Sequence, residues 1–205
     1  MLNEVEQVIS DLKQGKMVII VDNEDRENEG DLIIPADCVT IADVNFMITH
    51  AKGLLCLTLT QEKCSILNLE LMAKHNKSKF STNFTISVEA ATNIGTGISA
   101  RDRWHTIKTI TAPTATPNDY VSPGHMFPLI AHPEGVLGRN GHTEAGCDLA
   151  KMAGFSPAAV IIEVLNEQGD SAKRSELEIF SKKHNLKITS IDKIINYRKQ
   201  TQNLL

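Results

Sequence analysis

The acidic segment DNEDRENEGD, residues 22–31, places six carboxylates and one arginine in ten positions between two hydrophobic runs. Because like charges repel, so many carboxylates on a short segment need cations among them or full contact with water. If the segment is extended, Glu27, Glu29 and Asp31 point to one side, and their oxygens suit Mg²⁺ or Mn²⁺. Arg26 pairs equally well with a carboxylate or a phosphate. Taken alone, the segment slightly favours a solvated acidic turn over half of a cation site.

A second candidate is RNGHTEAG, residues 139–146, which precedes a predicted helix over 143–152. A glycine just before a helix leaves backbone N–H groups free to face an anion, and Arg139 adds a positive charge. Thr143 either caps the helix or donates to a phosphate, and His142 could hold a metal or carry a proton. An ordinary helix start with a surface histidine explains the segment about equally well.

Three single residues also have possible chemistry. Glu163 interrupts the apolar run AAVIIEVL, where an ionised carboxylate needs a partner or acquires a raised pKa, so it is a candidate acid or base. His125 follows a Pro-Gly pair in SPGHMFPL, and without further context it is simply an exposed or hydrogen-bonded imidazole. Cys56 in LLCLTLT is typical of a small core residue. The GTG at 95–97 is too short to indicate a phosphate loop, and SARDR after it indicates helix capping.

The elements that must position these residues alternate between strand and helix patterns without a break in composition. This alternation predicts one α/β domain over residues 1–205. Predicted strands are 17–22, 32–34, 54–60, 84–90, 158–165 and 187–190. Predicted helices are 2–13, one beginning at Thr40 with Asp43, 61–67, 99–110, 143–152, 175–185 and one from Ser190. We expect loops at 112–124 and at 69–83, and the second is long enough to be a mobile lid.

Composition excludes several functional classes. The chain has 205 residues, a net charge of −4 and a pI of about 6, which argues against a nucleic-acid partner. No apolar run approaches the roughly 18 residues that a membrane span needs. The four cysteines show no CxxC spacing, and the N-terminus lacks the pattern of a secretory signal. We therefore expect a cytoplasmic protein with free thiols.

Together, five segments resemble the 3,4-dihydroxy-2-butanone 4-phosphate synthase family in order and spacing. They are DNEDRENEGD, FTISVEA with TGISARDR, PGHMFPL, GVLGRNGHTEA and AGFSPAAVIIEVLNEQG, and the resemblance runs from about residue 4 to residue 197. It implies conversion of D-ribulose 5-phosphate to L-3,4-dihydroxybutan-2-one 4-phosphate and formate, for riboflavin synthesis. It also implies Mg²⁺ (or Mn²⁺), a homodimer with active sites at the subunit interface, and a layered α/β fold with a mixed sheet flanked by helices.

The resemblance also implies roles for individual residues. Glu27 and His142 match the metal ligands, and His125 and Glu163 match positions essential for turnover. Cys56 and Glu163 match residues that line the substrate site. The remaining implied contacts to the sugar phosphate are Arg26, Glu27, Asp31 and the segment Arg139, Asn140, Gly141, His142 and Thr143.

The chain departs from the family pattern at Asn23, Asn83, Ser122, Ile130 and Asn140. Ser122 and Ile130 stand where arginines are usual, so two positive charges near the PGH segment are lost. The metal and acid–base positions are intact, which favours an active lyase. The alternative is a divergent paralogue that binds a sugar phosphate without this turnover.

Overall fold

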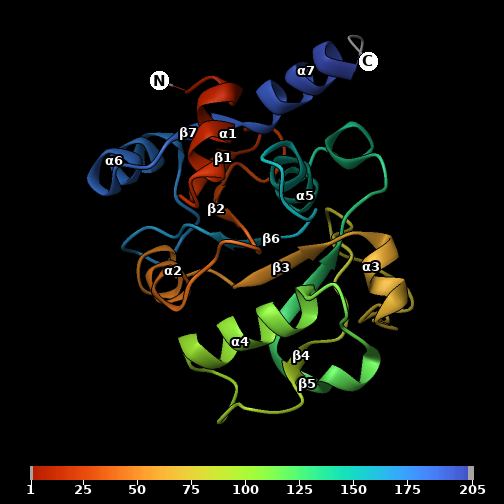
Figure 1. Cartoon of the computed structure of the whole chain (residues 1–205). Helices are drawn as coiled ribbons and strands as arrows, with labels where there is room; N and C mark the ends of the chain where they lie inside the picture. The colour runs from red at the N-terminus through yellow and green to blue at the C-terminus, as the bar shows by residue number, and fades with distance from the viewer. Residues whose placement is uncertain (1, 203–205) are drawn as a thin grey trace.

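The strands of the computed structural model, which describes residues 2–202, form one seven-stranded sheet in the order β4-β5-β3-β6-β2-β1-β7 (Figure 1). Two strand pairs, β1 with β7 and β3 with β5, are parallel, and the other four are antiparallel. The predicted mixed sheet is therefore confirmed. The strand bounds are β1 (Val18–Val21), β2 (Gly30–Pro35), β3 (Cys56–Leu59), β4 (Val88–Ala90), β5 (Tyr120–Ile130), β6 (Ala159–Glu163) and β7 (Ile188–Ser190).

The helices lie close to their predicted positions. Thr40 and Ser99 are the N-caps of α2 and α4, and their side chains accept from the backbone N–H groups of Asp43 and Asp102. A π-helical turn, η1 (Met47–Ala51), continues α2, and short 3-10 turns lie at Pro117–Asp119 and Gly135–Leu137. The helix bounds are α1 (Val5–Lys13), α2 (Ile41–Phe46), α3 (Gln61–Ile66), α4 (Ala100–Thr111), α5 (His142–Met152), α6 (Arg174–His184) and α7 (Ile191–Gln202).

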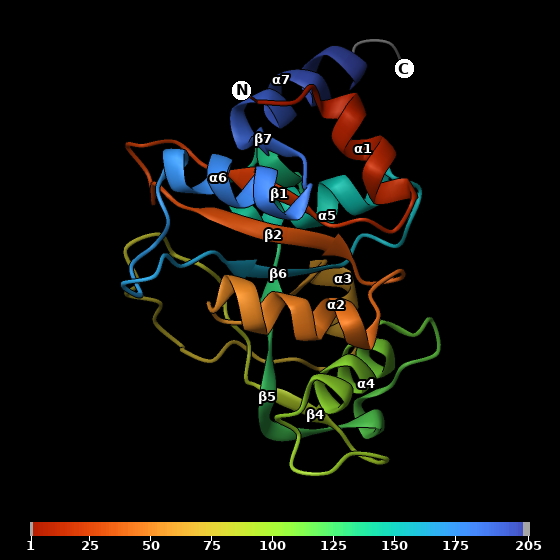
Figure 2. The same ribbon diagram turned by 90° about the vertical axis from the view of Figure 1, so that its left-hand side faces the viewer.

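The sheet has an apolar core on each face because alternate strand residues point to opposite sides. In β1, Val18 and Ile20 belong to the cluster packed with α1, α5 and α7, whereas Ile19 and Val21 belong to the cluster packed with α2, α4 and α6. Figure 2 shows α1 and α7 at one end of the molecule and α4 with β4 at the other. The central strands β1, β3 and β6 are buried on both faces, which explains their nearly unbroken apolar sequences.

Two sequence predictions are wrong in this region. Residues 120–124 were expected in a loop but begin the long strand β5. The apolar alternation is lost there because the pairing shifts register: Val88 pairs with Met126, but Glu89 pairs with Val121. The strand predicted at 84–90 is regular only from Val88, because residues 84–86 bond to two different segments, around 70–72 and 128–130.

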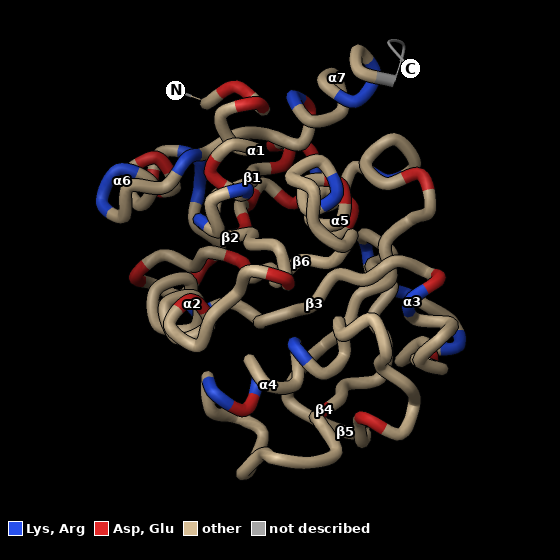
Figure 3. The backbone as a smooth tube through the Cα atoms, viewed as in Figure 1, with Lys and Arg blue, Asp and Glu red and all other residues tan. Residues whose placement is uncertain are grey.

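The segment from 69 to 83 is irregular, as predicted, and residues 70–79 are exposed. Figure 3 shows acidic and basic positions mixed along α3 and α6 rather than separated. Among the described residues, no helix combines the length and the apolar character that crossing a membrane requires.

Candidate functional site

The acidic segment folds around Asp22, which follows directly after β1. The carboxylate of Asp22 accepts hydrogen bonds from Arg26 Nη1 at 3.0 Å and from the backbone N–H groups of Glu27 and Glu29, both at 2.9 Å. The segment is therefore a tight turn at residues 24–27, not the extended loop considered from the sequence. The turn nevertheless brings Glu27, Glu29 and Asp31 to one cavity.

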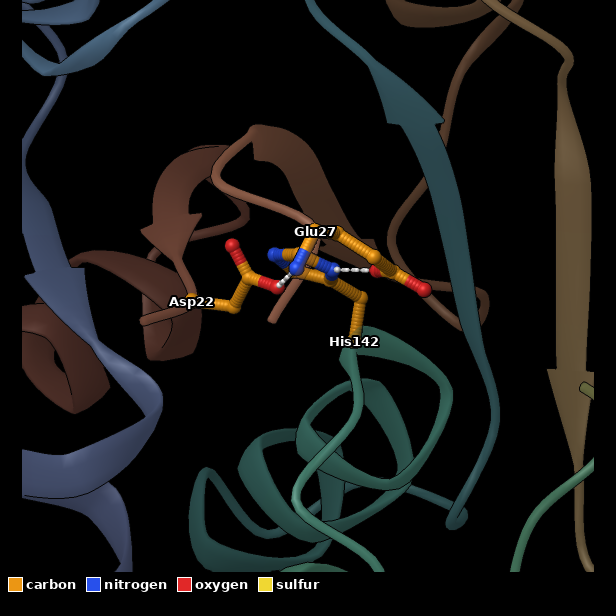
Figure 4. Close-up of side chains that lie close together, drawn as sticks. All are labelled: Asp22, Glu27 and His142. Atoms are coloured by element: carbon orange, nitrogen blue, oxygen red, sulfur yellow. Dashed lines mark hydrogen bonds and ion pairs between the residues drawn. The ribbon is translucent and has the colours of Figure 1, made fainter. Parts of the chain in front are cut away.

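His142, the first residue of α5, lies against this turn (Figure 4). Its Nε2 atom is 3.1 Å from the carbonyl oxygen of Ile20, and Nδ1 lies 3.5 Å from Glu27 Oε2 and 3.8 Å from Asp31 Oδ1. The carbonyl can only accept, so Nε2 carries a proton and Nδ1 is the nitrogen that faces the carboxylates. Burial alone would lower the pKa of His142, but Asp31 and Glu27 raise that pKa to about 9.

The surrounding carboxyl groups have different pKa values because their environments differ. Burial raises the pKa of Asp31 well above its usual range, and Glu163 and Glu29 add to this effect against the charge of His142. Burial also raises the pKa of Glu29. For Glu27 burial acts in the same direction, but the hydrogen bond with His142 and the charge of Arg26 outweigh it and lower the pKa. Neighbouring carboxyl groups with separated pKa values can divide acid, base and ligand roles.

These residues fit a divalent cation. Two sets, Asp22–Glu27–His142 and Glu29–Asp31–His142, each keep their ligand atoms within 4.8 Å of one another. Within residues 2–202, Asp31 Oδ1 is a buried acceptor that has no hydrogen-bond donor. A buried carboxylate oxygen without a donor is costly, and a cation beside it would remove that cost. The bond from Nε2 to a backbone carbonyl also orients the ring as metal-binding histidines require.

Glu163 and Cys56 line the cavity from two neighbouring strands, with Glu163 at the end of β6 and Cys56 at the start of β3. Glu163 ends β6 opposite Asp31 of β2, and its Oε2 accepts from the backbone N–H of Leu54 at 2.8 Å. The expected partner of this carboxylate is thus a backbone amide. Gly53 lies so close that an added Cβ would be 2.6 Å from Oε2. Burial is the main cause that raises the pKa of the Cys56 thiol, and the negative charges of Glu163 and Asp31 raise that pKa further. The thiol is therefore a neutral group here.

The start of α5 also lines the cavity. Gly141 is its N-cap, and no side chain caps the first turn. Arg139 donates to Glu144 Oε2 at 2.6 Å and, from Nη2, to Phe80 O at 3.0 Å and Thr82 Oγ1 at 2.9 Å. The 69–83 segment is therefore tied to the site through Arg139, and the guanidinium of Arg26 lies 5.3 Å from the centre of the Phe80 ring.

The cavity collects most of the residues singled out from the sequence. It is lined by Arg26, Glu27, Glu29, Asp31, Cys56, Arg139, His142, Thr143 and Glu163, together with Thr82, Phe84, Leu129 and Ile161. A larger hollow of about 280 Å³ near Leu59, Ile66 and Pro157 has no comparable cluster of titratable groups among the described residues. We therefore regard the smaller, polar cavity as the functional site.

Three predicted residues lie outside this cavity. His125 is exposed on β5 and contacts Glu89, and Asn140 lines a separate hollow beside α7. Gly141 contributes as the N-cap of α5 without lining the cavity. Sequence reasoning also missed Asp22 as the centre of the acidic turn. Its position directly after a buried strand, followed by a polar segment, is typical of an Asp that binds backbone N–H groups in a turn.

Comparisons of the sequence and of the structure with known proteins point to the same family. The family model described as 3,4-dihydroxy-2-butanone 4-phosphate synthase matches residues 6–197. A protein of that name from Pseudomonas aeruginosa is 54% identical over 197 residues, which are 96% of this chain and 54% of the relative. The chain thus spans about half the length of this relative and of several others.

Solved structures agree with the sequence comparison. A two-domain 3,4-dihydroxy-2-butanone 4-phosphate synthase from A. baumannii matches with a TM-score of 0.92 and 54% identity, over 96% of this chain and 58% of that one. A synthase of this kind in complex with two magnesium ions matches with a TM-score of 0.91 and 37% identity, over 100% of both chains.

Proposed function

This chain belongs to the 3,4-dihydroxy-2-butanone 4-phosphate synthase family, and from that premise we propose that it converts D-ribulose 5-phosphate to L-3,4-dihydroxybutan-2-one 4-phosphate and formate in riboflavin biosynthesis. One observation carries the proposal. Acidic, basic, imidazole and thiol side chains from four separate segments of the chain line a single cavity. A ketose phosphate needs this combination: cationic groups for the phosphate, and acid and base groups at the carbons that react.

Glu27 and His142 would hold Mg²⁺ or Mn²⁺, with Asp31 as the neighbouring carboxylate that lacks a hydrogen-bond donor. A bound divalent cation would stabilise negative charge on the ketone and hydroxyl oxygens of the sugar. Arg26 donates to Glu27 Oε2 at 2.5 Å and keeps that carboxylate ionised and oriented toward the imidazole.

Glu163 is suited to move a proton at the substrate. The reaction begins with removal of the proton at C3, next to the C2 ketone, and later steps need protons returned and removed. Glu163 has one oxygen fixed by the N–H of Leu54, so its carboxylate has a set direction within the cavity. Cys56 beside it is a neutral thiol that shapes the apolar side of the site.

The start of α5 is suited to the phosphate end of the substrate. The positive end of the helix and its uncapped N–H groups attract an anion, and Thr143 adds a hydroxyl. The charge of Arg139 adds to this attraction, although its guanidinium group already donates hydrogen bonds to Glu144 and Thr82. Phosphate binding would therefore loosen or rearrange the contacts that hold the 69–83 segment.

His125 would act from a second copy of the chain. In its own chain it is exposed and lies outside the cavity. A homodimer with sites at the subunit interface would bring this imidazole to the partner's cavity. The exposed apolar side chains Leu54, Ile98 and Val121 provide surface that such an interface could cover.

The test is formate release from D-ribulose 5-phosphate by the purified chain, with and without EDTA. We expect release with Mg²⁺ present and none after chelation. Thermal stabilisation by the substrate without formate release would instead support a sugar-phosphate binder that lacks turnover. Release that is unaffected by EDTA would contradict the metal requirement.

A further inference from the structure

His125 contacts a carboxylate that is largely enclosed by the protein. Its Nδ1 atom pairs with Oε1 of Glu89, which lies on the neighbouring strand β4. The Glu89 side chain is only 15% exposed, whereas that of His125 is 45% exposed. One partner is thus fixed in the protein while the other presents its ring to the surface.

The register shift in β5 brings His125 to this position. Residues 122–125 lie between the pairs Glu89–Val121 and Val88–Met126, so they bulge from the ladder. Ser87 bonds to the bulge through both its side chain and its backbone. Its Oγ accepts from Gly124 N at 3.1 Å, and its carbonyl accepts from Ser122 Oγ at 2.7 Å. Ser122, where the family usually has arginine, therefore has a structural bond in this chain.

Two glycines enclose Glu89. A Cβ on Gly124 would overlap the backbone of Val88 and Cγ of Glu89, and a Cβ on Gly97 would overlap the Glu89 carboxylate. Gly97 also has a φ of +86°, a conformation that glycine adopts without strain. Both positions therefore require glycine if Glu89 is to keep its place.

The loop that carries Gly97 is itself fixed by Asp102 in the first turn of α4. The Asp102 carboxylate accepts from the backbone N–H groups of Gly95 and Gly97, each at 3.2 Å. These bonds, first of all that of Gly95, lower the pKa of Asp102. Asp102 of the SARDR segment thus holds the GTG segment in place, and Gly97 of that segment packs against the Glu89 carboxylate.

We propose that Glu89 is a positioning residue for His125, in that it fixes the imidazole with a proton on Nδ1 and leaves Nε2 free to exchange a proton with the substrate. An ionised carboxylate only accepts hydrogen bonds, so the nitrogen facing it must be the donor. In the neutral ring the other nitrogen is then an acceptor. The effect of Glu89 on turnover rests on the proposed function. The ring state of His125, meaning which ring nitrogen carries the proton, is a property of the protein alone.

The ring state is tested by two-dimensional ¹H–¹⁵N NMR of the His125 ring, with His125→Ala identifying the signal. Spectra are taken at successively higher pH until the ring is neutral. We expect the Nδ1–H form in the wild type and mainly the Nε2–H form, which free histidine prefers, in Glu89→Ala. Glu89→Gln keeps an acceptor oxygen and should retain the Nδ1–H form. An Nε2–H ring in the wild type would overturn the inference.

The consequence for turnover is tested by steady-state kinetics. Glu89→Ala should lower kcat about 10–100-fold while KM changes less than about threefold, since a positioning residue supports only part of what a general acid or base contributes. In a His125→Ala background the same change should have little further effect. Full additivity of the two losses would contradict action through His125. Glu62→Gln is the control, because it removes one negative charge from an exposed residue of α3. It should leave kcat unaltered.

The two measurements keep the conclusions separate. Failure of the wild type to release formate would end the proposed function, whereas the NMR result needs no turnover and decides the Glu89 contact by itself. Thermal unfolding of each variant shows whether a loss of activity comes from a loss of folding.

Discussion

The Oε2 atom of Glu27 lies 3.5 Å from Nδ1 of His142, and Arg26 Nη1 donates to the same oxygen at 2.5 Å. One carboxylate oxygen is therefore shared by an imidazole from α5 and a guanidinium from its own turn. Glu27 and His142 would together hold a divalent cation, and Arg26 orients the Glu27 carboxylate for that role. The first two predictions follow from this arrangement.

Glu27→Gln and His142→Ala should each weaken Mg²⁺ or Mn²⁺ binding by at least about tenfold, because each removes one ligand from the cluster. Isothermal titration calorimetry measures the affinity, and circular dichroism checks that the fold survives. Glu24→Gln is the matched control, because Glu24 belongs to the same turn but is exposed. Unchanged titration curves for both ligand variants would refute the assignment of these residues.

Metal affinity should increase as the pH rises. Below its pKa of about 9, His142 is protonated on both ring nitrogens and cannot bind a metal, so binding must displace a proton. The raised pKa of Asp31 acts in the same direction. We expect the apparent affinity for Mn²⁺ to increase about tenfold per pH unit below pH 9 and to level off above it.

Calorimetry in buffers of different ionisation enthalpy measures the released proton directly. Release of about one proton near neutral pH is the expected result. Binding that is independent of pH in the wild type would show that His142 is not a ligand. In His142→Ala the remaining affinity should depend less on pH than in the wild type.

Much of the site was predictable because it is built from short contiguous segments. The turn after β1, the start of α5 and the end of β6 each keep their functional residues within a few positions, and the strand and helix patterns locate those segments. The pairing of Asp31 with Glu163 was not predictable, because it depends on which strands are neighbours in the sheet. Sequence periodicity gives the faces of a strand but not its partner.

The region around His125 shows a different limit. The pattern SPGH contains a proline and a glycine, which normally predict a turn. In the fold these residues form a bulge inside a strand, and the carboxylate that contacts His125 lies 36 positions earlier in the sequence. Only the tertiary structure gives Glu89 and the two glycines around it a common role.

Gly53 should be required for turnover through its contact with Glu163. A Cβ at this position would be 2.4 Å from the backbone oxygen of Glu163, 2.6 Å from its Oε2 and 2.9 Å from its Cβ, so Gly53→Ala must displace Glu163 as a whole, its carboxylate included. We expect kcat to fall about tenfold or more, with a smaller change in KM, as for loss of an oriented acid or base. Steady-state formate release measures both constants.

Gly169→Ala separates this effect from a general loss of stability. Gly169 has a φ of +88° and no neighbouring atom within 4 Å of an added Cβ, so its substitution strains the backbone without adding a contact to Glu163. That variant should unfold at lower temperature and keep its kcat. If Gly53→Ala retained wild-type kcat, direct positioning of Glu163 by this close contact would be excluded.

The 69–83 segment should open when its bonds to the site arginines are removed. Thr82→Val eliminates one of the two acceptors of Arg139 Nη2, the one at 2.9 Å, and Phe80→Ala eliminates the ring that lies 5.3 Å from the Arg26 guanidinium. Loss of one hydrogen bond to a charged group should favour the open segment about tenfold. Trypsin cleavage after the exposed Lys74, Lys77 and Lys79 measures the opening, and the rate should rise in proportion. Ser78→Ala, which loses only an exposed bond to Asn76 within the segment, should be cleaved like the wild type. An equal rise in all three variants would mean that the segment's own structure, and not its contact with Arg26 and Arg139, keeps it closed.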